Sequence, residues 1–498
     1  MGLLTSLFLA PLIGAFIIIF IPKDEVKAVK LVAALSALVS LVVALYAYFA
    51  YDKAAGGLQF VENFAWTTDL GVSYFLGVDG ISLPMVLLTA LIGFTSIYAS
   101  WGENKRPKEF FILLLILIAG VMGTFVAQDI FIFLLFYEVV VIPIYIMVII
   151  WGSSKRVTKE YSAMKLTIYL LVGSAFLLAG MIALYVKAGA STFSIPEIAA
   201  MDFSESTQIF LFFFLLVGFG SLLSMWPFHS WSPDGYAGAP TAVSMIHAGV
   251  LKKIGGYGLI RIGLAILPLG AKFWAPYIVG LGVIGAVYAS FAALKQRDLK
   301  YIVGYSSVAH MGFVLIGIAA MNVISVNGAI ANMFAHGVMA ALFFAMIGYV
   351  YGKTHTRNVD ELGGLAHQLP KVATGFVIAG MASLGLPGLI SFVPEFTIFV
   401  GAWSEAAYRP MVIFGIASII LTAMYNLRLI ATSMFGPRKA QYDSVPDARG
   451  AELVPLFLLG AVIIIGGLFP SLLTDMVNSG VDTLMAKIAE VLPVGGSN

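Results

Sequence analysis

The stretch FFILLLILIAGVMGTFVAQDIFIFLLFYEVVVIPIYIMVIIW, residues 110–151, contains two long apolar runs and only two charged side chains, Asp129 and Glu138. A helix needs about 17–25 predominantly apolar residues to cross the ~30 Å hydrocarbon core of a bilayer, and each run has that length. The stretch therefore predicts two consecutive membrane-spanning helices.

The same pattern recurs along most of the chain. Of 498 residues, 60% are hydrophobic and 11% charged, whereas soluble domains carry about 25% charged residues. We therefore predict an all-α polytopic membrane protein with about fourteen transmembrane helices. The predicted spans lie near residues 3–22, 31–50, 78–101, 110–127, 129–151, 162–186, 207–226, 239–262, 275–294, 301–321, 327–351, 372–392, 409–435 and 453–470.

Composition also excludes several kinds of function. The net charge is only +2 and there is no cysteine, so we expect neither a nucleic-acid partner nor a disulfide or iron–sulfur cluster in this chain. No phosphate-binding Gly-Lys-Ser/Thr loop and no cluster of metal-ligand residues occurs, so we expect no cofactor and no metal.

The ends of the chain have their own signals. The first apolar run lacks a basic leader and a cleavage site, so it is expected to be a membrane span rather than a removable signal peptide. Residues 471–494 mix charges with leucines and are expected to form an amphipathic helix along the surface.

Basic residues in the connecting loops alternate with the predicted spans. Loops after even-numbered spans hold only Lys53, Lys187, Lys272 and Arg409, and the remaining loop lysines and arginines follow odd-numbered spans. Positive residues favour the cytoplasmic side of a membrane. This distribution places the odd-numbered loops in the cytoplasm and both termini on the non-cytoplasmic side.

Two predicted spans contain helix-breaking segments, residues 226–240 with Pro227, Pro233 and Pro240, and residues 384–395 with Pro387 and Pro394. Proline removes a backbone donor, and unwound backbone at membrane depth persists only inside protein or beside a wet cavity. The breaks lie five spans apart, which predicts two inverted repeats; simple kinks in packed helices are the alternative. The corresponding division is residues 1–109, a first repeat at 110–268, a second repeat at 269–436, and a C-terminal part at 437–498.

Ionisable side chains within the spans are the candidate functional residues. Each one costs roughly 2.5–3.5 kcal/mol at the bilayer centre, so it needs a reason to be there. Glu, Lys and His are the side chains whose protonation burial can bring near neutral pH, and a series of them predicts a proton relay. The candidates are Glu138, Lys165, His229, Lys252, Lys253, His310, His336 and Glu395.

Each candidate has a structural alternative. Glu138 could form a structural ion pair, and the histidines could be core residues bonded to backbone carbonyls. Lys252 and Lys253 are about 100° apart on a helix, so we expect one of them to snorkel or pair outside the relay. Arg261 lies near a span end and is expected to anchor the membrane interface.

Several segments resemble the antiporter-like membrane subunits of respiratory complex I (NADH:quinone oxidoreductase), and the pattern is most similar to chain M. The segments that carry the resemblance are Phe75–Ser82, Phe136-Tyr137-Glu138, Pro227-Phe228-His229-Ser230-Trp231, Ala239-Pro240-Thr241, Gly249–Lys253, Gln296–Lys300, Tyr305–Gly312, Ala382–Gly388 and Glu395.

This resemblance implies a fourteen-span fold with inverted repeats, and proton pumping coupled to quinone reduction in partner subunits. It implies that Glu138 modulates a lysine, that Lys253 is the central relay group, and that Glu395 exchanges protons with the outside. His310 and His336 would lie on the connecting path. The implied partners are chain N-type and chain L-type membrane neighbours and, through them, the quinone-reducing hydrophilic arm, in a bacterial plasma membrane.

The chain departs from the family pattern at three positions. Leu222 stands where the family usually has a lysine, Ser232 where it has leucine, and Tyr236 where histidine is common. The usual partner of Glu138 is therefore missing. We hypothesise that Lys253 or Lys252 replaces it; the alternative is an altered or silent half-channel.

Other functions stay open on the sequence alone. The alternatives are a subunit of a cation/proton antiporter, a membrane subunit of a hydrogenase-type complex, and a purely structural membrane anchor. The number of charges predicted within the membrane argues against the anchor.

Overall fold

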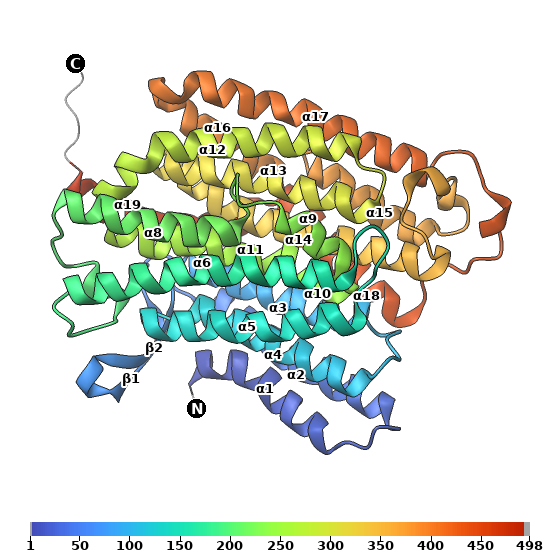
Figure 1. Ribbon diagram of the computed structural model, residues 1–498, viewed down its shortest axis with the longest axis horizontal. Coiled ribbons are helices and arrows are strands. Elements are labelled where there is room, and N and C mark those ends of the chain that lie inside the picture. Colours follow the sequence, from blue (N-terminus) through green and yellow to red (C-terminus); the bar gives the residue numbers. More distant parts are fainter. Residues whose placement is uncertain (1, 493–498) are drawn as a thin grey trace.

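The computed structural model describes residues 2–492 and is built almost entirely of helices that run roughly parallel to one another (Figure 1). The polytopic all-α class predicted from the sequence is confirmed. The helices of the described range are α1 (Leu3–Phe20), α2 (Val26–Ala50), α3 (Ser82–Ala99), α4 (Pro107–Val126), α5 (Ile130–Trp151), α6 (Lys159–Lys187), α7 (Ile195–Ile198), α8 (Glu205–Leu223), α9 (Trp231–Gly238), α10 (Thr241–Ile246), α11 (Lys252–Gly258), α12 (Pro268–Lys295), α13 (Leu299–Ala319), α14 (Val323–Thr354), α15 (Pro370–Ser383), α16 (Phe392–Ser404), α17 (Arg409–Ser433), α18 (Leu453–Leu468) and α19 (Ser471–Val491).

Twelve helices in the described part of the chain are long and apolar enough to cross a membrane. Two of the fourteen predicted spans, residues 239–262 and 372–392, are instead built from shorter helical pieces. The longer count therefore stays a prediction, as does the inverted repeat.

The two predicted helix breaks are real interruptions of helical backbone. The first lies between Leu223, where α8 ends, and Trp231, where α9 begins, and Ser224 there has a φ of 66°. The second lies between α15 and α16, where Gly385 has a φ of 71°. Residues of α9 are almost all buried, whereas residues 386–388 of the second break are exposed.

The predicted eighth span is one helical rod with two π-helical turns. Between α10 and α11 lies η2 (His247–Leu251), and after α11 lies η3 (Leu259–Leu264). Single π turns inside helices are rare and concentrate at functional sites. The first turn ends immediately before Lys252, so the local distortion sets the direction of the two lysines.

Burial separates central helices from peripheral ones. Nearly all residues of α13 and of the middle of α14 are buried. Most residues of α17 and α18, by contrast, are partly or fully exposed. Large apolar residues cover these exposed surfaces, for example Phe414 and Phe457. This is the pattern of a helix bundle whose outer face meets lipid or neighbouring subunits.

Two elements at one end of the bundle complete the fold. The strands β1 (Gln59–Thr67) and β2 (Val72–Val78) form an antiparallel hairpin that the sequence did not predict. The predicted amphipathic C-terminal helix is confirmed as α19, which buries Leu473, Met476 and Val477 on one face. Residues 493 and 494 of that prediction lie outside the described residues.

The π turn η2 and α14 pack backbone against backbone. A methyl group added at Gly337 would lie 2.5 Å from the carbonyl oxygen of Gly249 and 2.6 Å from the side chain of Leu88. Because glycine has only a hydrogen atom in place of a side chain, α14 can approach the lysine-bearing helix closely at Gly337.

We predict that Gly337→Ala lowers the free energy of unfolding by about 1–3 kcal/mol, because the new methyl group overpacks a backbone contact. Gly352→Ala on the same helix is the matched control, since nothing lies within 4 Å of its added methyl group. Thermal unfolding of the detergent-solubilised protein measures both. Equal melting temperatures for the two variants would contradict the proposed close contact.

Candidate functional site

Two adjacent lysines begin α11 in the centre of the bundle, and both are 0% exposed. Lys253 Nζ lies 2.8 Å from His336 Nδ1 and also donates to the backbone oxygen of Ala248. Lys252 Nζ points elsewhere and donates to Ser232 Oγ at 3.3 Å and Ser307 Oγ at 3.2 Å.

Of the two outcomes expected for one of these lysines, snorkelling or pairing outside the relay, the structure shows the second: Lys252 is buried and bonded to Ser232 and Ser307. Because α11 packs against α4, α8, α13 and α14, every face of the helix meets protein. Lys252 also lies 5.6 Å from the centroid of the Tyr236 ring, whose π face attracts a cation. Each amine thus has its own set of polar or aromatic neighbours.

A chain of buried titratable groups continues from Lys253 towards α16. The rings of His336 and His310 lie 5.2 Å apart between centroids, and His310 Nε2 lies 3.4 Å from Glu395 Oε1. The exposed fractions of His310, His336 and Glu395 are 1%, 1% and 5%. The structure therefore brings four of the predicted residues into one series, Lys253–His336–His310–Glu395.

Both ring nitrogens of His310 face backbone carbonyl oxygens. Its Nδ1 lies 2.7 Å from the carbonyl oxygen of Ser306, and its Nε2 lies 3.1 Å from that of Ser383. A neutral imidazole has one N–H and can donate to only one of these oxygens, whereas an imidazolium donates to both. The pocket therefore accommodates the charged ring as well as the neutral one.

Several uncharged polar side chains near His310 were not predicted from the sequence. Tyr425 donates to Ser306 Oγ at 2.8 Å, and Asn426 Nδ2 donates to Ser383 Oγ at 3.1 Å. Ser306 and Ser383 contact each other at 3.3 Å. Tyr425 and Asn426 are adjacent polar residues within an apolar span, which is the signal that could have identified them.

Glu395 lies beside the second helix break. An apolar groove of about 420 Å³ runs past it, lined by Leu384, Gly385, Phe392, Phe396, Phe399, Val400, Trp403, Ile416 and Ile419. A methyl group on Gly385 would lie 2.9 Å from Glu395 Oε2, so the unwound turn sits directly against the carboxyl group.

Glu138 is separate from this series. It is half-buried on α5, and Ser174 Oγ of α6 donates to its Oε1. Within residues 2–492 it forms no ion pair, so the hypothesised pairing with Lys252 or Lys253 is not present. Leu222 is buried and apolar and supplies no substitute.

Lys165 and His229 also lie outside the series. Lys165 Nζ forms an ion pair with Asp234 Oδ2 at 2.7 Å, and Tyr301 donates to the other oxygen of Asp234 at 2.7 Å. His229 packs edge-on against Tyr288 with ring centroids 5.0 Å apart. These residues form local contacts around the first helix break.

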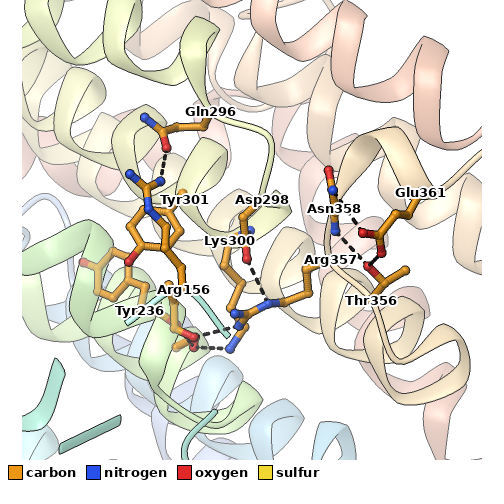
Figure 2. Close-up of polar contacts among 12 residues, drawn as sticks. Arg156, Tyr236, Gln296, Asp298, Lys300, Tyr301, Thr356, Arg357, Asn358 and Glu361 are labelled. Carbon is orange, nitrogen blue, oxygen red and sulfur yellow. Dashed lines mark hydrogen bonds and ion pairs between the residues drawn. The ribbon is translucent and has the colours of Figure 1, made fainter. Parts of the chain in front are cut away.

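A basic cleft of about 560 Å³ lies where the loops before α6 and α13 meet residues 355–361, which follow α14 (Figure 2). Its lining residues are Lys155, Arg156, Lys295, Gln296, Arg297, Asp298, His355, Thr356, Arg357, Asn358 and Glu361. The guanidinium of Arg156 lies 4.4 Å from the Tyr301 ring centroid, and Arg357 Nε lies 3.2 Å from Asp298 Oδ2.

The carboxylate of Glu361 in this cleft accepts hydrogen bonds from Thr356 and Asn358. These hydrogen bonds lower the pKa of Glu361 below its usual value. Below the cleft, the buried Lys300 donates to Ala239 O at 2.6 Å and Ser244 Oγ at 3.1 Å (Figure 2 shows its position). Buried cationic and hydroxyl groups thus continue from the cleft towards α10.

Arg261 is not an interface anchor as expected. Its Nη2 lies 2.5 Å from Asp79 Oδ1, and its Nε donates to Tyr257 at 3.2 Å. The pair is largely buried. It ties η3 to the residue that follows β2.

No group of three or more His, Cys, Asp or Glu side chains gathers to hold a metal within residues 2–492.

The family model for the NADH:quinone oxidoreductase/Mrp antiporter transmembrane region matches residues 127–422. The chain belongs to this family. NAD(P)H-quinone oxidoreductase chain 4 1 of Synechococcus sp. (strain JA-2-3B'a(2-13)) is 38% identical over 450 residues, covering 89% of this chain and 85% of the relative.

Solved structures of the family share the fold. A chain of respiratory complex I from Thermus thermophilus with bound NADH superposes with a TM-score of 0.89 at 23% identity, covering 98% of this chain and 99% of that one. A chain of the Mrp complex from Dietzia sp. DQ12-45-1b gives 0.86 at 21%, covering 97% and 98%. The predicted resemblance to complex I antiporter-like subunits is thus confirmed at the level of the family.

The range matched by the family model contains all eight predicted site residues. The ion pair between Asp79 and Arg261 joins this range to the N-terminal part of the chain, because Asp79 precedes it and Arg261 lies within it. The pair therefore holds the hairpin end of the protein against the core that carries the site.

We predict that Asp79→Asn destabilises the protein by about 3–5 kcal/mol, because it leaves the charge of Arg261 buried without its partner. Asp360→Asn is the matched control: it breaks the exposed pair with Arg297, and such pairs contribute about 0–1 kcal/mol. Thermal unfolding separates the two. A drop for Asp360→Asn as large as that for Asp79→Asn would refute this ranking.

Proposed function

We propose that this chain is a proton-translocating membrane subunit of an NADH:quinone oxidoreductase, occupying the position of chain M. The observation that carries the proposal is the buried series Lys253–His336–His310–Glu395, in which each titratable group lies next to the following one. Buried titratable groups are rare within membranes and mark ion and proton paths.

In this proposal the series works as a relay. Lys253 as an ammonium donates its proton to His336 Nδ1 across the 2.8 Å contact, which leaves a neutral amine and an imidazolium. His336 then passes the proton to His310 or releases it, and a charged His310 faces the carboxylate of Glu395. Each step moves one positive charge between neighbours inside protein, where fixed dipoles replace water.

The energy source lies outside the chain. We propose that quinone reduction in the hydrophilic arm of the complex drives the relay through neighbouring chain N-type and chain L-type membrane subunits. The plasma membrane of a bacterium, with both termini on the non-cytoplasmic side, is the proposed location. The basic cleft of Figure 2 would then face the cytoplasm, in line with the positive-inside rule.

We also propose fourteen spans arranged as two inverted repeats, at residues 110–268 and 269–436. Two features support this arrangement. Each broken helix pair, α8/α9 and α15/α16, follows a long helix, the 29-residue α6 in one half and the 32-residue α14 in the other. Each break also lies beside titratable side chains.

Lys252 is proposed to replace the lysine that is absent at Leu222. Its amine is fully buried and bonded to Ser232 and Ser307, next to the relay rather than next to Glu138. Glu138 then acts at a distance or in a local role with Ser174, while Lys165 and His229 stabilise the first break.

A cation/proton antiporter subunit is the second candidate, favoured by the fold likeness to the Mrp complex chain. The two candidates differ in partners and energy source. Purification of the intact complex distinguishes them: flavin and iron–sulfur subunits that oxidise a reduced nucleotide support the first, and a purely membranous complex without them supports the second.

We predict that Lys253→Met abolishes most proton translocation by the assembled complex, because it removes the central proton carrier. Lys272→Met is the matched control, since that lysine is exposed at the start of α12. Quenching of a pH-sensitive dye in sealed vesicles measures translocation. Full translocation by an assembled Lys253→Met complex would reject the relay. A purely structural membrane anchor would then be the better-supported function.

We predict that Lys252→Ala reduces translocation more than Glu138→Gln does, because only Lys252 contacts groups adjoining the relay. The same vesicle assay compares the two variants at equal amounts of assembled complex. Unchanged translocation in Lys252→Ala would exclude this lysine as the replacement. A larger loss in Glu138→Gln would return Glu138 to the main path.

A further inference from the structure

A polar pocket of about 370 Å³ lies between α14, α16 and α19, at the end of the bundle that carries the β1–β2 hairpin (Figure 1). The wall from α19 consists of Thr474, Asn478 and Asp482, which are spaced four residues apart and therefore share one face. Asn327 contributes a further polar group from α14. At about 30 Å³ per water molecule, the pocket has room for on the order of ten waters.

Asn332 lies deeper on α14 and is 0% exposed. Neither its amide nitrogen nor its amide oxygen has a hydrogen-bond partner in the described part of the chain. A buried polar group left unpaired costs about 1–3 kcal/mol, and water is the usual partner where protein supplies none. A water molecule beside Asn332 would satisfy both groups of its amide.

Asn332 stands midway between the pocket and the relay. Gly328, Asn332 and His336 follow one another at four-residue intervals on α14, so they lie on one face of the helix, about 6 Å apart along its axis. Gly328 lines the pocket, and His336 contacts Lys253. This face leads from the polar pocket to the buried series.

The groove beside Glu395 offers a poorer way out. Apart from the carboxyl group itself, its lining side chains are hydrocarbon, aromatic or indole groups, or glycine. Such a surface does not hold a chain of hydrogen-bonded waters. The pocket at α19, by contrast, offers amide, hydroxyl and carboxylate groups and has no lysine or arginine in its lining to repel a proton.

We infer that protons leave the buried series through a hydrated route that runs from His336 past Asn332 into the pocket between α14, α16 and α19, with Asp482 at its mouth. The route rests on the proposed function and extends it. In the releasing step the imidazolium of His336 gives its proton to a water held by Asn332, and the ring returns to its neutral form. Glu395 then serves to hold charge on His310 rather than to discharge protons.

The first test is Asn332→Leu in the assembled complex. Leucine has nearly the same shape and removes an unpaired buried amide, so a purely structural role predicts an equally stable or more stable protein with normal translocation. The exit route predicts loss of most translocation, at least fivefold, with assembly retained. The sealed-vesicle dye assay supplies the readout.

The second test uses the natural absence of cysteine in the chain. Asn478→Cys is labelled with a bulky, membrane-impermeant thiol reagent, and attachment to this chain is verified by its mass. Asp475→Cys is the matched control, because Asp475 is exposed on the same helix but does not line the pocket. Labelling at Asn478→Cys is expected to inhibit translocation, and labelling at Asp475→Cys is not.

The outcomes separate the route from the function on which it rests. Loss in Asn332→Leu together with selective inhibition at Asn478→Cys supports the route, and any other combination overturns it. Should Asn332→Leu not assemble, the labelling result alone decides. If Lys253→Met has lost translocation while both of these tests are negative, the relay stands and only this exit is wrong.

Discussion

Two primary amines are buried next to each other in the middle of the bundle, and the surrounding structure is arranged to accommodate them. An amine in the membrane interior has no bulk water to accept its hydrogen bonds, so protein oxygens, nitrogens and aromatic faces must do so. Lys252 is served by α9 and α13, and Lys253 by η2 and α14. Four segments are therefore fixed around α11 by the needs of two side chains, and the relay is a consequence of that arrangement.

The two broken helix pairs each contain a short unwound segment, but the surroundings of the two segments differ. In the first, α9 is buried, and its side chains Ser232 and Asp234 bind Lys252 and Lys165. In the second, the unwound turn reaches the surface and abuts Glu395. Among the described residues, Glu395 is the carboxyl group that contacts a histidine of the series. The carboxylate of Glu138 instead accepts a hydrogen bond from Ser174.

The fold was largely predictable because span length and loop charge are local properties of the chain. The two helix breaks were also predictable, because the proline and glycine residues that cause them lie within the broken segments. Which titratable groups meet was less predictable: Lys253 and His336 are 83 residues apart, and only tertiary packing brings them together. The family resemblance named the four residues that lie in one buried series, whereas the hypothesised pairing of Glu138 with Lys252 or Lys253 is not present among the described residues.

Other features left no local signal that periodicity could detect. The β1–β2 hairpin lies in a loop between apolar runs, with β1 largely exposed and β2 largely buried. The sequence around Arg261 gives no sign of its partner Asp79, which is 182 residues away. Asn332 lies between apolar residues of α14, and the sequence does not show which neighbouring helices its side chain faces. In each case the information lies in the contact between distant segments rather than in the segment itself.

The helix α14 connects these sites mechanically. It carries both His336 and Asn332, its middle part is buried, and its backbone touches η2 with only hydrogen between them at Gly337. A side-chain tip lies roughly 5–6 Å from a helix axis, so a turn of the helix by about 20° would move that tip by about 2 Å. Such a turn would break the 2.8 Å contact between Lys253 and His336. The close backbone contact at Gly337 opposes such a turn, so one glycine helps to keep the imidazole within hydrogen-bonding distance of the amine.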